Sequence, residues 1–555
     1  MRGALLASLL ALGACAAPSS FDGVAGGTKE DAAVEAPRPV SPVTVSLVAS
    51  SRPRLKWSLG ASATGAIVEM SRTRDFVAVK RFEAKGTELV VPEDLELGVW
   101  FWRLKGAAAG TVGTTASVIW EMVVRGPAAN GSSDAPTRSM VDMNGDGEPD
   151  LLIGATVADG DGSSGGGVAL PGGPSAAGTP KPAATTSAIV FFYGGDPVKG
   201  FSKGGKDGIL GNQGSTYDGP MSIGGGTDLD GDGLTDMIEA GSYAMAEDGQ
   251  YWFDPSVTYA SKGGEWAFDL ERGGPLYIGQ GGASSLPSVR EGADVDGDGY
   301  GDALIGLEDF GFLMLGSVVK APNMPAIMAV APGMSSARTS KSRVAMGSFD
   351  ANGDGLADVA FSYQSDFDPT ARAFAAAGDR AQRIGEPKMI DAPDAKLATA
   401  FAAGDFNGDG IDDVAVTTPV GSATRICLWY GHREQLLTPG PCVAAPAGDA
   451  DFGASLTAVD LEGDGVDELL ATAKAGDVEG VRVVRVANGA ATAQPIGQPG
   501  LGVRLTTIWP GRPGKARWAA VAADGSRVGV YEGADLKETL TPPPGTVRGF
   551  GRGLR

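Results

Sequence analysis

Short apolar segments recur along most of this chain, and each follows a stretch rich in aspartate and glycine. Examples are residues 151–153, 303–305 and 414–416, and a second apolar run often comes next, as at 426–430. Runs of this length, punctuated by Gly, Asp and Pro, predict short strands joined by turns. The pattern therefore predicts an all-β chain.

The stretch before each strand has a common form, Asp-x-[Asp/Asn/Glu]-Gly-Asp-Gly-x-x-[Asp/Glu]. It starts at Asp142, Asp228, Asp294, Asp350, Asp405 and Asp460. The starts are 86, 66, 56, 55 and 55 residues apart. A repeat of roughly 50 residues indicates a propeller or a solenoid. A unit of about four strands with one such loop is typical of a propeller blade.

Beyond the sixth loop the strand pattern continues without the acidic residues. Residues 518–522 and 527–531 predict strands, whereas Arg512 and Lys515 stand where carboxylates are expected. A [Phe/Leu]-Gly-x-x-Leu segment also recurs every 49 residues, last at 550–554. We therefore predict a seven-bladed β-propeller. The last segment could supply a strand that closes the ring against the first blade, unless residues 137–141 serve that blade alone.

The repeated loop has the ligand pattern of a site for a hard cation. Oxygens at positions 1, 3, 5 and 9, with a backbone carbonyl at 7, suit Ca²⁺, and glycines at 4 and 6 allow a tight turn. The predicted ligands are Asp142, Asn144, Asp146, Glu148 and Asp150; Asp228, Asp230, Asp232, Leu234 and Asp236; Asp294, Asp296, Asp298, Tyr300 and Asp302; Asp350, Asn352, Asp354, Leu356 and Asp358; Asp405, Asn407, Asp409, Ile411 and Asp413; and Asp460, Glu462, Asp464, Val466 and Glu468.

Two other interpretations of these loops are weaker. The segment from Asp228 to Glu239 fits the EF-hand pattern, but position 12 is apolar in the other loops and strands are predicted on both sides. Acidic turns without an ion would bring carboxylates together that repel one another. The loops at 228 and 294 carry four aspartates, whereas the two glutamates at 460 predict weaker binding.

The charge of the chain follows from these loops. They hold 21 carboxylates at ligand positions, and the formal net charge is −22. The acidity therefore indicates metal binding rather than a cationic partner. No basic stripe is present, which disfavours nucleic-acid binding.

The Phe-Gly strand start, the acidic nonapeptide and the apolar strand after it together resemble the FG-GAP (VCBS-type) repeats of the integrin-α N-terminal propeller. The resemblance covers roughly residues 128–555. It implies a seven-bladed β-propeller whose lower loops hold Ca²⁺, here up to six ions. It implies no particular ligand, because one fold serves many functions.

Residues 41–126 predict a separate module before the propeller. Alternating apolar and polar positions at 67–70, 99–104 and 118–123 are typical of a β-sandwich. The order of Trp57, the Trp100-Phe101-Trp102 segment and Trp120 resembles a fibronectin type III domain. We expect these tryptophans in the core.

The first residues predict export. Arg2, the apolar run 5–12 and a small-residue end are typical of a secretory signal. The Leu-Gly-Ala-Cys ending resembles a bacterial lipobox, which makes residues 1–15 a lipoprotein signal peptide with lipidation at Cys15. A plain signal peptide cleaved near Ala17 is the alternative. Residues 16–40 then form a flexible tether, and the expected location is the bacterial cell envelope, preferably the outer membrane on its periplasmic or outer side.

The remaining cysteines, Cys427 and Cys442, favour a disulfide in an exported chain, with buried free thiols as the alternative. His432 is the only histidine, and no nucleophile–base pair is identifiable. We therefore predict a non-catalytic, Ca²⁺-binding envelope lipoprotein whose propeller binds an unknown protein or glycan. The alternatives are a Ca²⁺-dependent polysaccharide lyase or hydrolase with a Lys or Arg base, and an envelope assembly scaffold.

Overall fold

The structure is a computed structural model, and it describes residues 29–30, 33–44, 46–48, 50–124, 141–143, 149–158, 185–196, 200–203, 209–211, 222–244, 250–259, 271–272, 276–280, 288–291, 294–306, 311–317, 346–363, 372–381, 383–390, 400–420, 423–487, 489–509, 516–542, 546–548, 550–551 and 554. Over these ranges all regular secondary structure is β-strand, which confirms the predicted all-β fold. None of them forms a helix long and apolar enough to cross a membrane.

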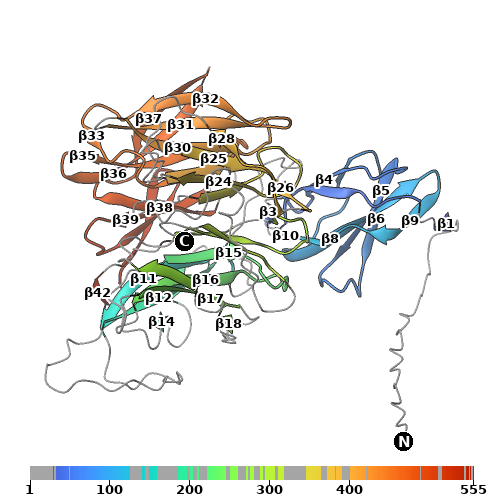
Figure 1. Cartoon of the computed structure of the whole chain (residues 1–555), viewed down its shortest axis with the longest axis horizontal. Helices are drawn as coiled ribbons and strands as arrows, with labels where there is room; N and C mark the ends of the chain where they lie inside the picture. The colour runs from blue at the N-terminus through green and yellow to red at the C-terminus, as the bar shows by residue number, and fades with distance from the viewer. Residues whose placement is uncertain are drawn as a thin grey trace, which may run out of the picture.

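The N-terminal part is a sandwich of two sheets, drawn in blue in Figure 1. The larger sheet contains β1 (Lys29–Glu30), β9 (Thr111–Ala116), β8 (Gly98–Ala108), β10 (Trp120–Val124), β3 (Ser46–Val48), β5 (Gly65–Ser71) and β6 (Lys80–Lys85). The smaller sheet contains β2 (Arg38–Ser41), β4 (Arg54–Ser58) and β7 (Glu88–Val90). Trp57, Trp100, Trp102 and Trp120 are all buried in the core between them, as expected.

The sandwich begins earlier than residue 41. Strands β1 and β2 lie within residues 16–40 or overlap their end, where the sequence predicts a tether. β1 pairs with β9, β2 pairs with β4, and Val34 between them is buried. A Pro- and Ala-rich composition is typical of a linker, but backbone pairing at a sheet edge needs little side-chain signal. A fragment starting at residue 41 would therefore remove strands of the sandwich.

The rest of the described chain forms seven separate sheets. In chain order they are β11 (Leu151–Ala158), β12 (Thr185–Asp196), β13 (Gly200–Lys203) and β14 (Ile209–Gly211) with β42 (Thr546–Arg548); β15 (Ser222–Thr227), β16 (Asp236–Ala244), β17 (Gln250–Thr258), β18 (Glu271–Arg272) and β19 (Leu276–Gln280); β20 (Ser288–Glu291), β21 (Ala303–Gly306) and β22 (Gly311–Met314); β23 (Met346–Phe349), β24 (Asp358–Tyr363), β25 (Arg372–Ala376) and β28 (Lys388–Ile390); β29 (Ala400–Gly404), β30 (Asp413–Val420), β31 (Ala423–His432) and β32 (Leu436–Ala444); β33 (Asp449–Ala450), β34 (Leu456–Val459), β35 (Glu468–Ala475), β36 (Val478–Ala487) and β37 (Ala490–Ile496); and β38 (Leu501–Trp509), β39 (Arg517–Ala522), β40 (Val528–Glu532) and β41 (Asp535–Leu540). In addition to these seven sheets, a separate two-stranded hairpin of β26 (Gly378–Asp379) and β27 (Arg383–Ile384) lies in the chain between β25 and β28.

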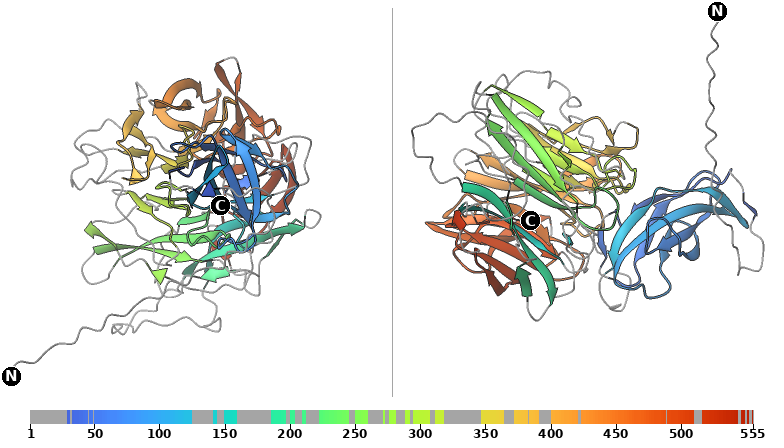
Figure 2. Two further views of the ribbon diagram at one scale, coloured as in Figure 1. Left: turned by 90° about the vertical axis from the view of Figure 1, so that its right-hand side faces the viewer. Right: turned by 90° about the horizontal axis from the view of Figure 1, so that it is seen from below.

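These sheets are arranged around a common centre as the blades of a β-propeller, and the left view of Figure 2 shows them behind the sandwich. The strand before each acidic loop contacts its counterpart in the next sheet, as β15 contacts β20 and β29 contacts β34. Apolar side chains pack between neighbouring sheets. The first strands therefore line the centre, and the acidic loops that follow them lie at one end of the propeller.

The end of the chain closes the ring. Strand β42 pairs with β11 of the first sheet, and Leu554 bridges to Ile153. Phe550, from the last Phe-Gly copy, is buried in a cluster that joins the first and last sheets. The predicted closure by this segment is therefore confirmed. In the fifth sheet, Cys427 of β31 lies opposite Cys442 of β32, and a disulfide joins them.

Candidate metal centre

The loops from Asp228, Asp294, Asp350 and Asp405 each connect the first and second strands of a sheet, and the loop from Asp460 connects β34 and β35. The loop that begins at Asp228 lies between β15 and β16, and the loop from Asp294 lies between β20 and β21. Glu239, the residue that completes the EF-hand pattern, lies within β16 and pairs with Ile223. Strands therefore flank this loop, and the EF-hand interpretation is wrong. Of the predicted ligands in the first loop, Asn144, Asp146 and Glu148 lie outside the described residues.

The first aspartate of a loop holds the loop's backbone. Oδ1 of Asp228 accepts hydrogen bonds from the N–H groups of Gly231 at 2.6 Å and Asp232 at 3.2 Å, and Oδ2 accepts one from Gly233 at 2.6 Å. The two glycines have φ of 74° and 91°, which favours glycine. Equivalent bonds to position 1 recur at Asp294, Asp350, Asp405 and Asp460. The sequence motif thus folds into the same local structure five times.

Two loops bring three carboxylates together. One carboxylate oxygen each from Asp228, Asp230 and Asp236 lies within 4.8 Å of the others. The corresponding residues of the next loop, Asp294, Asp296 and Asp302, form a second such cluster. These are positions 1, 3 and 9 of the two loops with four aspartates. Either cluster could hold a metal ion, and its oxygen-only donor set suits a hard cation.

The other predicted ligand positions lie beside these clusters. Asp232 and Asp298, at position 5, are exposed and accept a hydrogen bond from the backbone N–H at position 7, each at 2.9 Å. That bond fixes the backbone turn at Leu234 and Tyr300, the position 7 residues whose carbonyl oxygens are predicted ligands. Position 5 therefore stabilises the turn of each loop.

Asp228, Asp236, Asp294 and Asp302 of the two clusters are buried. Burial, with repulsion from Asp298, raises the pKa of Asp294 to about 7. Burial also raises the pKa of Asp302 well above its ordinary value. In other loops it raises the pKa values of Asp350 and Asp413 to about 8. Such shifts mean that the folded chain favours protons, or another cation, at these positions.

The last aspartate of a loop accepts a backbone hydrogen bond from the end of the second strand that follows the loop. Oδ2 of Asp302 accepts the N–H of Val295, and Oδ1 accepts the N–H of Gly316 at 3.0 Å. Asp358 with Gly378 and Asp413 with Gly431 repeat the second bond. A Cβ at Gly316 would lie 2.3 Å from the carbonyl oxygen of Gly301, so only glycine fits. The glycine that follows the second strand of these units is the sequence signal for this contact.

Position 8 links each loop to the loop before it. The N–H of this residue donates to the carbonyl of the previous first aspartate, through the pairs Thr235–Asp142, Gly301–Asp228, Ala357–Asp294, Asp412–Asp350 and Asp467–Asp405. Where position 8 has a polar side chain, its oxygen also accepts the N–H of that aspartate. The loops therefore form a continuous hydrogen-bonded belt, which our sequence analysis missed.

The sixth loop already contains a positive charge. Arg485 of β36 donates from Nε to Glu468 at 3.0 Å and from Nη2 to Glu462 at 3.3 Å. The guanidinium thus pairs with two of the four carboxylates predicted as ligands in this loop. This contact gives a reason, beyond glutamate length, to expect weak cation binding there.

The sandwich packs on the acidic loops of the second, third and fourth sheets. Arg74 donates to the carbonyl of Gly299 at 3.0 Å and lies 4.1 Å over the ring of Tyr300. A Cβ at Gly299 would lie 2.4 Å from the carbonyl of Ile119, and one at Gly355 would lie 2.7 Å from the ring of Trp120. The glycines of the loops therefore allow the sandwich to approach closely.

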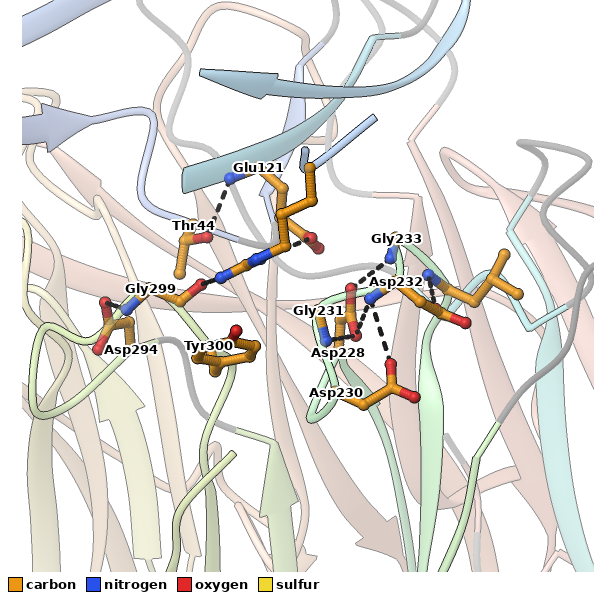
Figure 3. Close-up of polar contacts among 12 residues, drawn as sticks. Thr44, Glu121, Asp228, Asp230, Gly231, Asp232, Gly233, Asp294, Gly299 and Tyr300 are labelled. Carbon is orange, nitrogen blue, oxygen red and sulfur yellow. Dashed lines mark hydrogen bonds and ion pairs between the residues drawn. The ribbon is translucent and has the colours of Figure 1, made fainter. Parts of the chain in front are cut away.

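Glu121 of β10 is buried at this contact, with 4% of its surface exposed. Its N–H donates to Oγ1 of Thr44, which fixes the strand (Figure 3). Burial raises the pKa of Glu121 to about 7, against the opposing effects of a hydrogen bond with Asp228 and the charge of Arg74. A carboxyl group of the sandwich thus meets the acidic loop of the propeller.

Residues 397–426 match the family model described as the FG-GAP repeat. This segment contains β29, the loop from Asp405 and β30, so the repeat resemblance is confirmed for one unit of the chain. No curated protein matches the chain.

Several solved structures are similar in fold. A protein from Lactobacillus plantarum is 11% identical, with 73% of this chain and 98% of that chain covered and a TM-score of 0.41. An Agrocybe aegerita lectin that recognises non-reducing terminal N-acetylglucosamine is 12% identical, with 73% and 93% covered and a TM-score of 0.38. The Dos1 propeller is 10% identical, with 58% and 74% covered and a TM-score of 0.32. We draw no functional conclusion from similarities at this level.

Proposed function

We propose that this chain is a Ca²⁺-binding, seven-bladed β-propeller of the bacterial cell envelope that binds a protein or glycan partner without catalysing a reaction. In this proposal a fibronectin type III-like sandwich precedes the propeller, and a lipid on Cys15 anchors the protein to the membrane, preferably the outer membrane. Nucleic acid is not a partner.

The observation that carries the proposal is the pair of three-carboxylate clusters in loops of repeated geometry. Their donors are all oxygens, which disfavours Zn²⁺ because it prefers nitrogen and sulfur ligands. Ca²⁺ accepts six to eight oxygens in flexible arrangements, whereas Mg²⁺ prefers a strict octahedron and keeps several waters. A short loop that offers carboxylates and a backbone carbonyl therefore favours Ca²⁺.

The surroundings of the clusters favour a structural role for the ion. Asp294 and Asp302 each use both carboxylate oxygens to hold backbone N–H groups. The sandwich packs over the same loops, with Ile119 against Gly299, and limits access for a substrate. The ion would neutralise buried carboxylates and fix the strand connections. A partner would then bind on the opposite end of the propeller or on its sides.

A Ca²⁺-dependent polysaccharide lyase or hydrolase is the second candidate. Such an enzyme needs a Lys or Arg base beside the ion. Arg380 contacts the loop from Asp294 by donating to the Gly297 carbonyl at 3.0 Å. Arg74 contacts the loops from both Asp228 and Asp294. Its side chain is 19% exposed and engages the Gly299 carbonyl, the Tyr300 ring and Glu121. These contacts favour a structural role for Arg74. His432 accepts the N–H groups of Glu434 and Gln435 through Nδ1, which stabilises its own turn.

Calorimetric titration of the full chain with CaCl2, beside melting curves in EDTA and in Ca²⁺, tests the proposal. We expect at least two bound ions and a higher melting temperature in Ca²⁺. Absence of both would overturn the metal assignment. A screen against acidic polysaccharides tests the non-catalytic part, because any Ca²⁺-dependent product would favour the enzyme instead.

A further inference from the structure

The contact between the sandwich and the loop from Asp228 brings acids of two domains together. Glu121 and Asp228 are both buried, with 4% and 1% of their surfaces exposed. Asp228 also belongs to a cluster that could hold an ion. Two buried acids in contact repel each other when both are ionised.

The surrounding donors do not satisfy the Glu121 carboxylate. Its Oε2 is buried and has no hydrogen-bond partner among the described residues. The nearest positive group is Nη1 of Arg74, 3.9 Å from Oε2, which is beyond hydrogen-bond distance. The same guanidinium already donates to the Gly299 carbonyl. An unpaired buried carboxylate oxygen is costly, and such groups normally have a partner.

The position of Glu121 indicates what the partner is. In Figure 3 its side chain extends from β10 towards the loop that carries Asp228, Asp230 and Asp232. The local charge is strongly negative, because this loop carries four aspartates and Arg74 supplies one positive charge. A divalent cation that prefers oxygen would neutralise this excess and satisfy Oε2. A proton could satisfy one acid, but not the cluster as a whole.

We propose that Glu121 completes the cation site of the loop from Asp228, so that one ion is held jointly by the propeller and the sandwich. This inference rests on the proposed cation binding of the loops. The ion would then join the two domains, and removing it would weaken their contact. The loop from Asp294 has the same three-carboxylate cluster and meets the sandwich through Arg74 and the carbonyl of Ile119, so it serves as a comparison within the molecule.

The test compares the wild-type chain with Glu121→Gln by CaCl2 calorimetry. The substitution keeps the shape of the side chain and removes its charge. Glu83→Gln is the matched control, because Glu83 is an exposed glutamate of the same sandwich in β6. We expect Glu121→Gln to lower the affinity of one site tenfold or more, with the other sites unchanged. Asp230→Asn should weaken that same site, and the double variant should still show a single altered site.

Melting curves separate this role from simple structural support. Because Gln removes a buried charge that faces Asp228, Glu121→Gln should melt at an equal or higher temperature than wild type in EDTA. In Ca²⁺ it should gain less stability than wild type. Small-angle scattering should show the wild-type chain becoming more compact when EDTA is replaced by Ca²⁺, and Glu121→Gln changing less.

The outcomes distinguish two failures. If the wild-type chain binds no Ca²⁺, the proposed function and this inference fail together. If the wild-type chain binds Ca²⁺ and Glu121→Gln gives the same isotherm, the shared site is wrong while the proposed function stands. A variant that melts lower in EDTA, with all sites weakened equally, would also overturn the inference, because Glu121 would then only support the fold.

Discussion

Replacing Asp296 by asparagine separates two effects of the loop's negative charge. One is the repulsion between its carboxylates without metal, and the other is their attraction for Ca²⁺. Position 3 is already asparagine in two other described loops, where Asn352 and Asn407 accept the N–H at position 5 at 2.8 Å and 2.9 Å. Asp296 accepts the equivalent N–H of Asp298 at 3.2 Å. Asp296→Asn therefore preserves the loop's hydrogen bond and removes one negative charge from the cluster.

The size of the effect follows from the separation of the carboxylates. Two unit charges 4.8 Å apart repel by about 3.5 kcal/mol at an effective dielectric constant of about 20. Asp296 is half-buried, and its neighbour Asp294 has a pKa of about 7. Solvent screening and partial protonation reduce the repulsion, so we expect about 1 kcal/mol of added stability without metal.

With Ca²⁺ bound, the effect of Asp296→Asn on stability reverses its sign. Losing one charged ligand should weaken Ca²⁺ binding about tenfold, which is about 1.4 kcal/mol. The stabilisation by Ca²⁺ should therefore shrink by about 1.4 kcal/mol in the variant. A propeller of this size unfolds with an entropy of about 0.9 kcal/mol/K, so the difference between the melting temperatures in Ca²⁺ and in EDTA should narrow by about 1 to 2 °C.

Differential scanning calorimetry at pH 7.5, in EDTA and in excess Ca²⁺, measures the change in melting temperature in both conditions. Glu83→Gln is the control, since it removes one exposed negative charge of the sandwich. A variant that melts lower than wild type in EDTA would refute the repulsion argument. An unchanged shift on adding Ca²⁺ would refute a role for Asp296 as a ligand.

Three further predictions follow from the described contacts. In EDTA the free energy of unfolding should fall between about pH 4 and pH 8. The raised pKa values of Asp294 and Asp350, about 7 and about 8, give stability that is complete below the unfolded value and lost as pH rises through the folded value. Urea titration measures this, and a rise over that range would contradict it. Arg485→Gln should free both glutamates of the sixth loop and add one weak ion to the calorimetric count, whereas an unchanged count would mean that this loop binds no ion. Gly301→Ala should destabilise the chain by about 1 to 3 kcal/mol, because its Cβ would lie 2.1 Å from Oγ1 of Thr227, and a neutral result in denaturant would contradict that contact.

The sequence predicts those features that depend on local structure. Each acidic loop is followed by the strand that its apolar run predicts, as β16 follows the loop from Asp228. The closure of the ring was predictable because Phe550 repeats the pattern of Phe452, and both are buried. Repetition makes such signals strong, since every unit shows the same pattern independently.

The contacts between blades were not predictable in the same way. Asp412 accepts the N–H of Asp350 across 62 residues of sequence, and the residue type at its position varies from loop to loop. Gly316 is an ordinary turn glycine in sequence, and its closeness to the Leu229 carbonyl, 2.8 Å from the position of a Cβ, depends on how the third sheet sits beside the second. Register between sheets decides these contacts, and no periodicity within a unit reports it.

The sequence also did not predict that the sandwich docks on the acidic loops. This docking divides the loops into covered and open ones. Glu121 lies in a strand whose alternation predicts only an inner and an outer face. The loops from Asp228 and Asp294 meet the sandwich through Gly233 and Gly299, whereas a Cβ at Gly410 in the loop from Asp405 would meet no atom within 4 Å. Covered loops can combine metal binding with domain docking, while open loops can only stabilise their own sheet. Both loops with four aspartates are covered, together with the loop from Asp350, so the highest density of negative charge lies where a second domain can share the ion.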